Sequence, residues 1–380
     1  MKKRFLYFLK NYKYTVHLTL FLITLCCSIA AGIEWSTTKL VLFSEITAHD
    51  LNLGLQYAIS FLGILTVHEF GHYLTARYYK LDVSLPYYIP FWIPIGPSLG
   101  TMGAFISINS PMRSKKEFFD VGIAGPLAGF IAALGVLIYG FTHLPPPEYI
   151  FSIHPEYKQW GYNYAQHAYD VLPEGANFKI GENLLFKLMT NWLVDDLQSM
   201  PNAHELMHYP FLMAGYLACF FTSLNLLPIG QLDGGHILYG VFGYKKAKNV
   251  SFVLFLAFVF YAGLGLFNFT DFTSLAELPY IAIYIGFLYL IFEKIAKKDK
   301  VKVWAYVFSM FTLQLISSSF FGIEGYSGWL LFTFLLGRVL GVTHPPALYE
   351  EDLGLGRKIL AFISLVVFIL CATPSPFIFE

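Results

Sequence analysis

Charged side chains are scarce in this 380-residue chain: Asp, Glu, Lys and Arg make up 13% of it, against roughly 25% in soluble globular proteins. Hydrophobic residues make up 56%, and the mean hydropathy is +0.56. A soluble fold of this size could not bury so much apolar surface, and intrinsic disorder requires the opposite composition. The sequence therefore predicts a polytopic membrane protein.

Net charge and cysteine are also lacking. The 25 basic and 25 acidic side chains cancel, so the chain has no general positive field of the kind that binds nucleic acid. The four cysteines lie in apolar runs and form no CxxC pair: Cys26, Cys27, Cys219 and Cys371. This pattern is typical of small buried side chains and excludes a disulfide framework or a thiolate metal site.

Long hydrophobic runs, in contrast, are abundant. Crossing a bilayer takes about 20 apolar residues, and this criterion predicts an all-α integral membrane protein with about nine transmembrane helices. They lie near residues 14–33, 55–79, 119–142, 209–241 (interrupted), 249–268, 278–295, 302–319, 326–341 and 358–373. With the N-terminus in the cytoplasm, 21 of the 25 Lys and Arg fall on the cytoplasmic side, as the positive-inside rule requires. We expect a bacterial inner membrane and an uncleaved first helix.

Two connections between these spans are more than simple loops. Residues 81–118 are rich in aromatic residues, Pro and Gly and include short β-type runs, which predicts a re-entrant or membrane-surface β-hairpin. Residues 143–205 form a polar extracytoplasmic insert that is short for an independent domain. The expected organisation is a first helix and outer loop (1–54), a core in two parts (55–142 and 206–245) around the insert, and a C-terminal bundle (246–380).

The strongest chemical signal is the segment HEFGH, which lies within the second predicted span. His68 and His72 are four residues apart, so on a helix they lie one above the other and can bind a single zinc ion. Glu69 is placed to serve as general base toward a water molecule at the metal. Ionisable residues are costly inside a membrane, which makes two incidental buried histidines the weaker interpretation.

Zinc held by two histidines needs a third protein ligand and one open position. Asp233, in the segment NLLPIGQLDGGH, is a carboxylate within an apolar stretch, and Pro228 and Gly230 interrupt the helix before it. His68 lies nine residues before Arg77 and Asp233 lies twelve before Lys245, so both are at similar depth from the same face. The sequence therefore favours Asp233 as the third ligand.

A second HExxH, formed by His204, Glu205 and His208, is given little weight. Pro210 places His208 at a helix edge, and this motif lies at the outer end of the span that carries Asp233 at its inner end. An accessory surface metal site at His204 and His208 remains an open alternative.

Other polar and small residues in the spans have weaker interpretations. His236 is expected to hydrogen-bond near the metal rather than bind it. Asn225 either donates to a substrate carbonyl or pairs within the bundle, and the small residues of GIAGPLAG (122–129) predict close helix packing. Six further histidines are interpreted as incidental: His17, His49, His143, His154, His167 and His344.

HEFGH, NLLPIGQLDGG and FDVGIAGPLAGF together resemble the site-2 protease family of intramembrane zinc metalloproteases, peptidase family M50. The resemblance covers roughly residues 55–245 and implies His68, His72 and Asp233 as ligands of one Zn²⁺, with Glu69 as the base. It also implies that Asn225 positions substrate. It further implies that the hairpin around 96–108, with Gly103, Ala104 and Phe105, presents a strand edge to an extended substrate.

The chain departs from the family pattern at two places. The insert is too short for the PDZ domain that bacterial members usually carry there, and Gly230 stands where many relatives have a second proline. The predicted function is hydrolysis of peptide bonds in or near the transmembrane helix of single-span membrane proteins, at a site open toward the cytoplasm. The alternatives are a metal-ion transporter and a catalytically inactive membrane scaffold.

Overall fold

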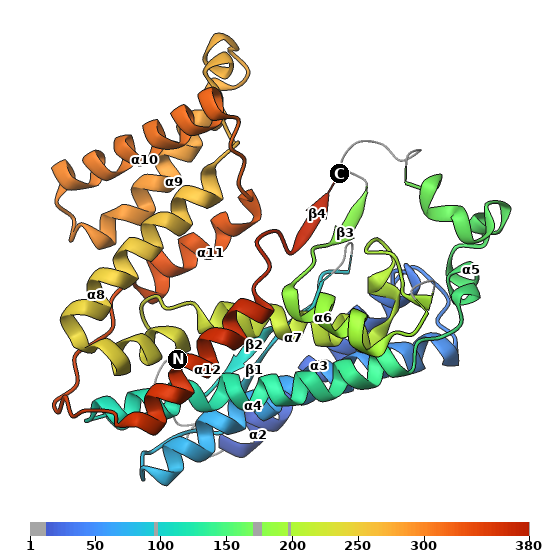
Figure 1. Ribbon diagram of the computed structural model, residues 1–380, viewed down its shortest axis with the longest axis horizontal. Coiled ribbons are helices and arrows are strands. Elements are labelled where there is room, and N and C mark those ends of the chain that lie inside the picture. Colours follow the sequence, from blue (N-terminus) through green and yellow to red (C-terminus); the bar gives the residue numbers. More distant parts are fainter. Residues whose placement is uncertain (1–12, 95–97, 170–176, 197–198, 380) are drawn as a thin grey trace. The chain divides into compact units, whose positions relative to one another are not determined.

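The computed structural model describes residues 13–94, 98–169, 177–196 and 199–379, which form two compact units (Figure 1). The first unit comprises residues up to 112, 123–225 and those from 362 onward, and the second comprises 113–122 and 226–361. Four of the basic residues used to orient the N-terminus (Lys2, Lys3, Arg4 and Lys10) lie outside the described residues.

Helices α2 (Lys13–Thr37) and α3 (Ala48–Tyr78) belong to the first unit and pack against each other. α3 begins at a capping box, because the Thr47 side chain accepts from the backbone N–H of Asp50 and the Asp50 carboxylate accepts from that of Thr47. Lys39 Nζ lies 2.6 Å from Asp50 Oδ2. The start of the 31-residue helix is therefore fixed, and HEFGH falls in its second half.

The predicted β-hairpin is confirmed. Strands β1 (Tyr87–Phe91) and β2 (Gly100–Phe105) pair antiparallel, from Tyr87 opposite Phe105 to Phe91 opposite Gly100. Gly100 has φ +81°, and a Cβ on it would lie 2.3 Å from Ser28 Cα on α2. Glycine is required there because the hairpin packs directly on the α2 backbone.

Helices α4 (Lys115–Thr142) and α7 (Pro210–Leu226) supply the rest of the apolar part of the first unit. Only the part of α4 from residue 123 onward belongs to this unit. Gly215 on α7 packs against Leu137 on α4 so closely that a Cβ would lie 2.4 Å from that leucine side chain. Small residues thus let the two helices approach, as predicted for the α4 glycines.

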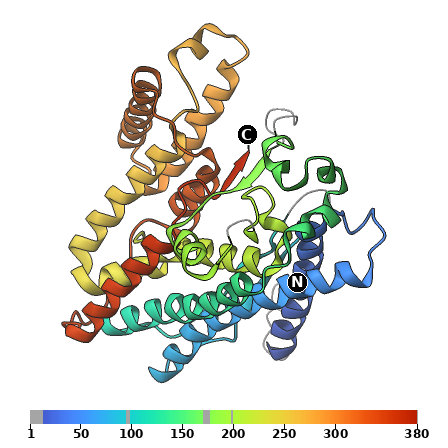
Figure 2. The same ribbon diagram turned by 45° about the vertical axis from the view of Figure 1, so that its right-hand side comes forward.

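The insert between α4 and α7 consists of short elements, drawn in green in Figure 2. They are η1 (Pro147–Tyr149), α5 (Ile150–Ile153), η2 (Pro155–Gln159), η3 (Gly161–Gln166), β3 (Phe178–Ile180), α6 (Leu184–Leu193) and η5 (Leu206–His208). β3 pairs antiparallel with β4 (Phe377–Phe379) near the end of the chain. The sequence alone does not predict this pairing, because nearly 200 residues separate two strands of three residues.

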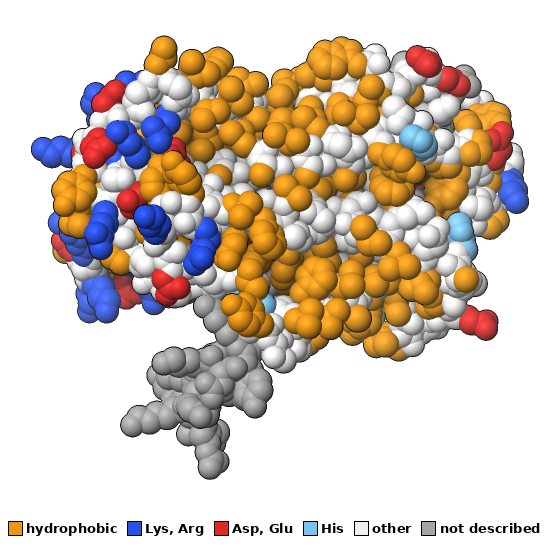
Figure 3. Space-filling model, turned by 90° about the horizontal axis from the view of Figure 1, so that it is seen from below, with side chains coloured by type: hydrophobic (Ala, Val, Ile, Leu, Met, Phe, Trp, Pro, Cys, Tyr) orange, Lys and Arg blue, Asp and Glu red, His pale blue; other side chains and the backbone are white. Residues whose placement is uncertain are grey.

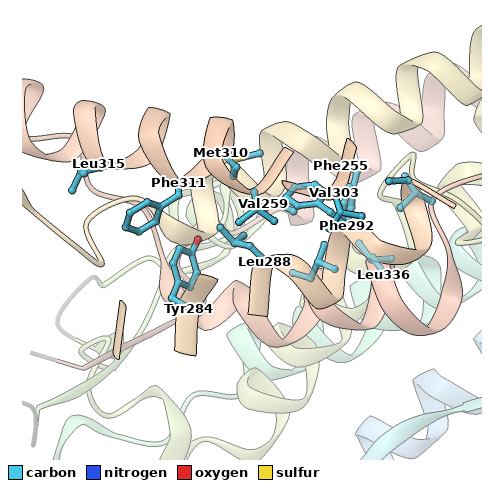
Figure 4. Packing of buried hydrophobic residues seen from close by; sticks show 14 of the residues in the cluster. Phe255, Val259, Tyr284, Leu288, Phe292, Val303, Met310, Phe311, Leu315 and Leu336 are labelled. Carbon is cyan, nitrogen blue, oxygen red and sulfur yellow. The ribbon is translucent and has the colours of Figure 1, made fainter. Parts of the chain in front are cut away.

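The second unit is a helical bundle whose core is shown in Figure 4. Its elements are α8 (Asp233–Gly263), η6 (Phe269–Thr273), α9 (Leu278–Ile295), α10 (Lys300–Phe321), η7 (Ser327–Trp329), α11 (Leu330–Phe334), the π-helical turn η8 (Leu335–Leu340) and the first turns of α12 (Leu355–Cys371). Phe255, Leu288 and Leu336 are fully buried in that core. The sequence predicted a break between residues 241 and 249, and Gly243 has non-helical backbone angles there (φ 72°, ψ 173°), so α8 consists of two helical segments that meet at a kink.

Six described helices are long and apolar enough to cross a membrane: α2, α3, α4, α8, α9 and α10. The predicted count of nine spans is not confirmed, because residues 210–226 and 327–340 form shorter apolar helices and α12 has 17 residues. The fold is mostly helical, but two small sheets make the expectation of an all-α fold inexact.

Hydrophobic side chains cover most of the face seen in Figure 3, and Lys and Arg side chains gather at one end of it. On α3, Ile59, Val67 and Leu74 are exposed at intervals of seven or eight residues. That spacing forms one apolar stripe along a helix. Exposed apolar stripes of this kind are what lipid contact requires, so we describe the chain as a membrane protein.

Candidate functional site

The HEFGH segment lies on the buried side of α3, opposite the exposed apolar stripe. His68, Glu69 and His72 are 6%, 5% and 7% exposed. The Nε2 atoms of His68 and His72 lie 3.1 Å apart. Helical spacing therefore brings both imidazoles to one point, as the sequence predicted.

Helix α4 packs against these histidines through glycine. A Cβ on Gly125 would lie 2.1 Å from His72 Nε2, and one on Gly129 would lie 3.0 Å from His68 Cβ. In return, a Cβ on Gly71 would lie 2.5 Å from the backbone oxygen of Ala124. The α4 glycines thus serve more than helix packing, because they leave the space that the two imidazole rings occupy.

Asn225, the next-to-last residue of α7, reaches the same point. Its Nδ2 lies 3.3 Å from His68 Nε2. Asn225 thus pairs with a residue of the HEFGH motif, and its donation to a substrate carbonyl stays a prediction.

The donor set of α3 fits a zinc ion. Tetrahedral zinc with ligand bonds of about 2.0–2.1 Å places neighbouring ligand atoms about 3.3–3.4 Å apart, close to the 3.1 Å between the two Nε2 atoms. Gly125 and Gly129 leave room for the two rings, because a Cβ at either position would press against His72 or His68. Glu69 follows His68 directly on the same buried helix, where a general base of this motif belongs.

Asp233 belongs to the second unit, where it is the first residue of α8 and is half-buried. The turn before it is tight: Gly230 has φ +60°, and a Cβ on Gly234 would lie 2.0 Å from the backbone oxygen of Leu226. The predicted helix interruption at Pro228 and Gly230 is present, since α7 ends at Leu226 and α8 begins at Asp233. This turn presents the Asp233 carboxylate at a helix N-terminus.

His236 contacts another histidine of the second unit. Its Nδ1 lies 2.7 Å from His344 Nε2, and the ring of Phe118 stacks on it at 5.6 Å between centroids. The hydrogen-bonding role expected for His236 agrees with this contact. His344, which the sequence suggests is incidental, does not lie alone, because it is buried and touches both His236 and Tyr239.

The predicted substrate-binding residues Gly103, Ala104 and Phe105 form the end of β2. Within the described residues β2 pairs with β1 alone, which leaves its other edge without a strand partner. Phe105 is 50% exposed. Binding of an extended substrate at this edge stays a prediction.

The second HExxH does not form a helical histidine pair. Its residues lie in a turn and in the short 3₁₀ helix η5, and His204 turns away, with Nδ1 2.9 Å from the Phe178 backbone oxygen. His208 is fully buried, so the alternative of a surface site at His204 and His208 is wrong. Burial by itself would raise the pKa of the Glu205 carboxyl. The interactions with His208 and Tyr169 lower this pKa, and it lies below its ordinary value.

A buried His-Glu-x-x-His helix among helices that can cross a membrane is the arrangement of membrane-embedded metallopeptidases. The family model of peptidase family M50 matches residues 56–267. The chain belongs to peptidase family M50.

Three plant proteins illustrate the similarity. The chain is 29% identical to "Probable zinc metalloprotease EGY1, chloroplastic" of Oryza sativa subsp. japonica, over 61% of this chain and 38% of that protein. It is 26% identical to the Arabidopsis thaliana protein of the same name, over 61% and 40%. It is also 26% identical to "Probable zinc metalloprotease EGY2, chloroplastic" of Oryza sativa subsp. indica, over 52% and 31%.

The chain thus spans well under half the length of these relatives. No solved structure matches it.

Proposed function

We propose that this chain is an intramembrane zinc metalloendopeptidase that hydrolyses peptide bonds in or near the transmembrane helix of single-span membrane proteins. The observation that carries the proposal is the pair of buried imidazoles on α3, whose Nε2 atoms lie 3.1 Å apart with Glu69 beside them. Membership in peptidase family M50 and the zinc metalloproteases among its relatives support it.

His68, His72 and Asp233 would hold one Zn²⁺. Support for Asp233 comes from each unit separately. In the first, Asn225 touches His68; in the second, the residue after Asp233 packs on the backbone of Leu226, which follows Asn225 in the chain. Chain connectivity thus favours a carboxylate close to the two imidazoles, and His₂-carboxylate is a usual zinc ligand set with one open position.

In this proposal Glu69 is the general base and the general acid. A zinc ion supplies Lewis-acid polarisation of the scissile carbonyl and lowers the pKa of a water molecule to about 7. Glu69 accepts a proton from the attacking water and then donates it to the leaving amine, so one carboxylate acts as base and as acid. Asn225, with its amide beside His68, is placed to donate to a carbonyl oxygen of the substrate.

The hairpin would hold the substrate in an extended conformation. A helical substrate hides its carbonyl groups in backbone hydrogen bonds, so it must unwind before hydrolysis. The open edge of β2 at Gly103, Ala104 and Phe105 offers backbone hydrogen bonds to an extended strand. Substrates with helix-weakening residues near the cleavage site are therefore expected.

The membrane orientation follows from charge. We place the N-terminus and the opening of the active site on the side that carries 21 of the 25 Lys and Arg. In a bacterial inner membrane this is the cytoplasmic side. The relatives are named chloroplastic, so their names give no support to a bacterial membrane in particular.

The two alternative functions lack such support. A transporter needs several weak ion sites along a path, whereas a general base beside a histidine pair serves hydrolysis. An inactive scaffold has no use for a buried carboxylate at residue 69, which is costly to keep inside a membrane.

Glu69→Gln provides the test. The purified full chain in detergent or vesicles is compared with this variant for zinc content and for cleavage of a single-span model substrate. Zinc retained at the wild-type level with hydrolysis reduced by at least about 10³-fold is expected. Glu182→Gln, which changes an exposed carboxylate of the insert, is the matched control and should cleave normally. Full activity in Glu69→Gln would reject the proposal.

A further inference from the structure

Three side chains of the first unit converge outside the α3 site. His154 follows α5 directly, Glu205 precedes η5, and His208 is the last residue of η5. His154 Nε2 lies 3.3 Å from His208 Nε2, and Glu205 Oε2 lies 3.2 Å from His208 Nε2 and 3.6 Å from His154 Nε2. Three potential ligand atoms therefore form a nearly equilateral triangle.

The partners of the three side chains turn those atoms inward. His208 Nδ1 lies 3.2 Å from the Ser36 backbone oxygen, and His154 Nδ1 lies 2.9 Å from Glu156 Oε1. Both partners can only accept, so each Nδ1 carries a proton, and in the neutral imidazole Nε2 then presents a lone pair to the centre. Metal-binding histidines are held in this way, by a carbonyl or carboxylate on the other ring nitrogen.

Glu205 is oriented by two tyrosines. The hydroxyls of Tyr157 and Tyr169 donate to Oε1 at 3.2 and 2.6 Å. Among the described residues no group donates a hydrogen bond to Oε2, although Glu205 is only 2% exposed. A buried carboxylate oxygen without a donor is costly unless a cation compensates it.

The size of the triangle matches a metal ion. Tetrahedral zinc with bonds of about 2.0–2.2 Å to nitrogen and oxygen has ligand-to-ligand edges of about 3.3–3.5 Å. The three observed edges are 3.2, 3.3 and 3.6 Å. The side chain of His154 is 21% exposed, so a water molecule can reach the fourth position.

We propose that His154, Glu205 and His208 form a metal site that binds one Zn²⁺ and fastens the insert to the end of α2, where Ser36 accepts from His208. The second histidine of the site is His154, which follows α5, rather than His204, so the site is not the HExxH pair that the sequence suggests. Its role is structural, since it joins two segments 54 positions apart in the chain. It does not depend on the protease proposal.

The test counts zinc in the full chain after purification and dialysis against Zn²⁺. To separate the two sites, the variants are made in a His68→Ala, His72→Ala background. There, the cluster should retain one zinc per chain and, with Co²⁺, give the visible absorption of a tetrahedral site. His154→Ala and Glu205→Gln should each lose both signals, whereas the control His204→Ala should keep them.

A second readout protects against variants that fail to fold. Zinc removal by a chelator should speed limited proteolysis within residues 143–169 by at least about tenfold, and added Zn²⁺ should reverse it, in wild type and in His204→Ala alike. Two results would overturn the proposal: no zinc in the His68→Ala, His72→Ala background, which identifies a protonated hydrogen-bonded cluster, or loss of that zinc in His204→Ala but not in His154→Ala.

Discussion

Single glycines decide whether the two imidazoles of α3 can meet. Gly125 and Gly129 on α4 lie so close to His72 and His68 that a side chain at either position would press against these histidines. The sequence suggested only that small residues allow helices to approach. The structure shows that the space they leave is the space of the candidate zinc ligands.

At the residue scale we therefore predict that Gly125→Ala displaces His72. The added Cβ would lie 2.1 Å from His72 Nε2, and the helix backbone that carries it cannot retreat easily. Zinc affinity at the α3 site should fall about 10–100-fold, with a parallel loss of hydrolysis. Zinc titration of the purified variant measures this.

Gly135→Ala on the same helix is the control, because a Cβ there meets nothing within 4 Å. Replacing a helical glycine with alanine in open space stabilises a helix by about 0.5–1 kcal/mol. Gly135→Ala should thus bind zinc normally. Equal zinc affinity in both variants would contradict the role assigned to Gly125.

Among the elements, the β1–β2 hairpin is the proposed substrate platform, and helices α2 and α3 hold it in place. β2 begins at Gly100, which packs on Ser28 of α2, and Tyr57 of α3 donates to the Leu99 backbone oxygen at 3.0 Å. Trp35 of α2 donates to the Ser98 oxygen at 2.7 Å. Both helices thus fix the start of β2.

We predict that Gly100→Ala loosens this attachment. The variant combines a strained left-handed backbone with a Cβ 2.3 Å from Ser28 Cα, so thermal unfolding should occur at a clearly lower temperature. Zinc should be retained while substrate KM rises, since the hairpin is proposed to bind substrate and not metal. Calorimetry and steady-state kinetics provide the two measurements.

Gly161→Ala isolates the backbone strain from the steric clash. Gly161 also has positive φ (+54°), but a Cβ there meets nothing within 4 Å. Gly161→Ala should lower the free energy of unfolding only by the backbone strain of about 1–2 kcal/mol, and the substrate KM should stay unchanged. A KM for Gly100→Ala equal to that of Gly161→Ala would argue against the hairpin as the substrate platform.

For the whole molecule, the charge distribution makes a prediction about topology. Single cysteines in place of Lys246 and Lys298 should react with a membrane-impermeant maleimide only from the N-terminal side of the membrane. Cysteines in place of Lys158 and Lys187 should react only from the opposite side. The measurement uses intact and inverted vesicles and a background without the four native cysteines.

Reaction of all four positions from one side would contradict the orientation. It would also contradict the placement of the two proposed zinc sites toward opposite sides of the membrane, because the second site involves the insert that carries Lys158 and Lys187. Under the expected topology that insert faces away from the opening to Glu69.

The sequence by itself determined the α3 motif, most helices and the hairpin. These features are local: the His68–His72 spacing follows from helix geometry, and the apolar runs and the Pro- and Gly-rich segment can be recognised within 20 to 40 residues. The motifs HEFGH, NLLPIGQLDGG and FDVGIAGPLAGF were enough to predict the family.

Only the tertiary structure decided which polar atoms meet across the insert. His154 replaces His204 beside Glu205 and His208, and β3 pairs with β4 from the far end of the chain. The physical reason is that these contacts depend on the paths of irregular segments between distant residues. No local spacing or hydrophobic period encodes those paths, whereas backbone hydrogen bonding within a helix repeats at every turn.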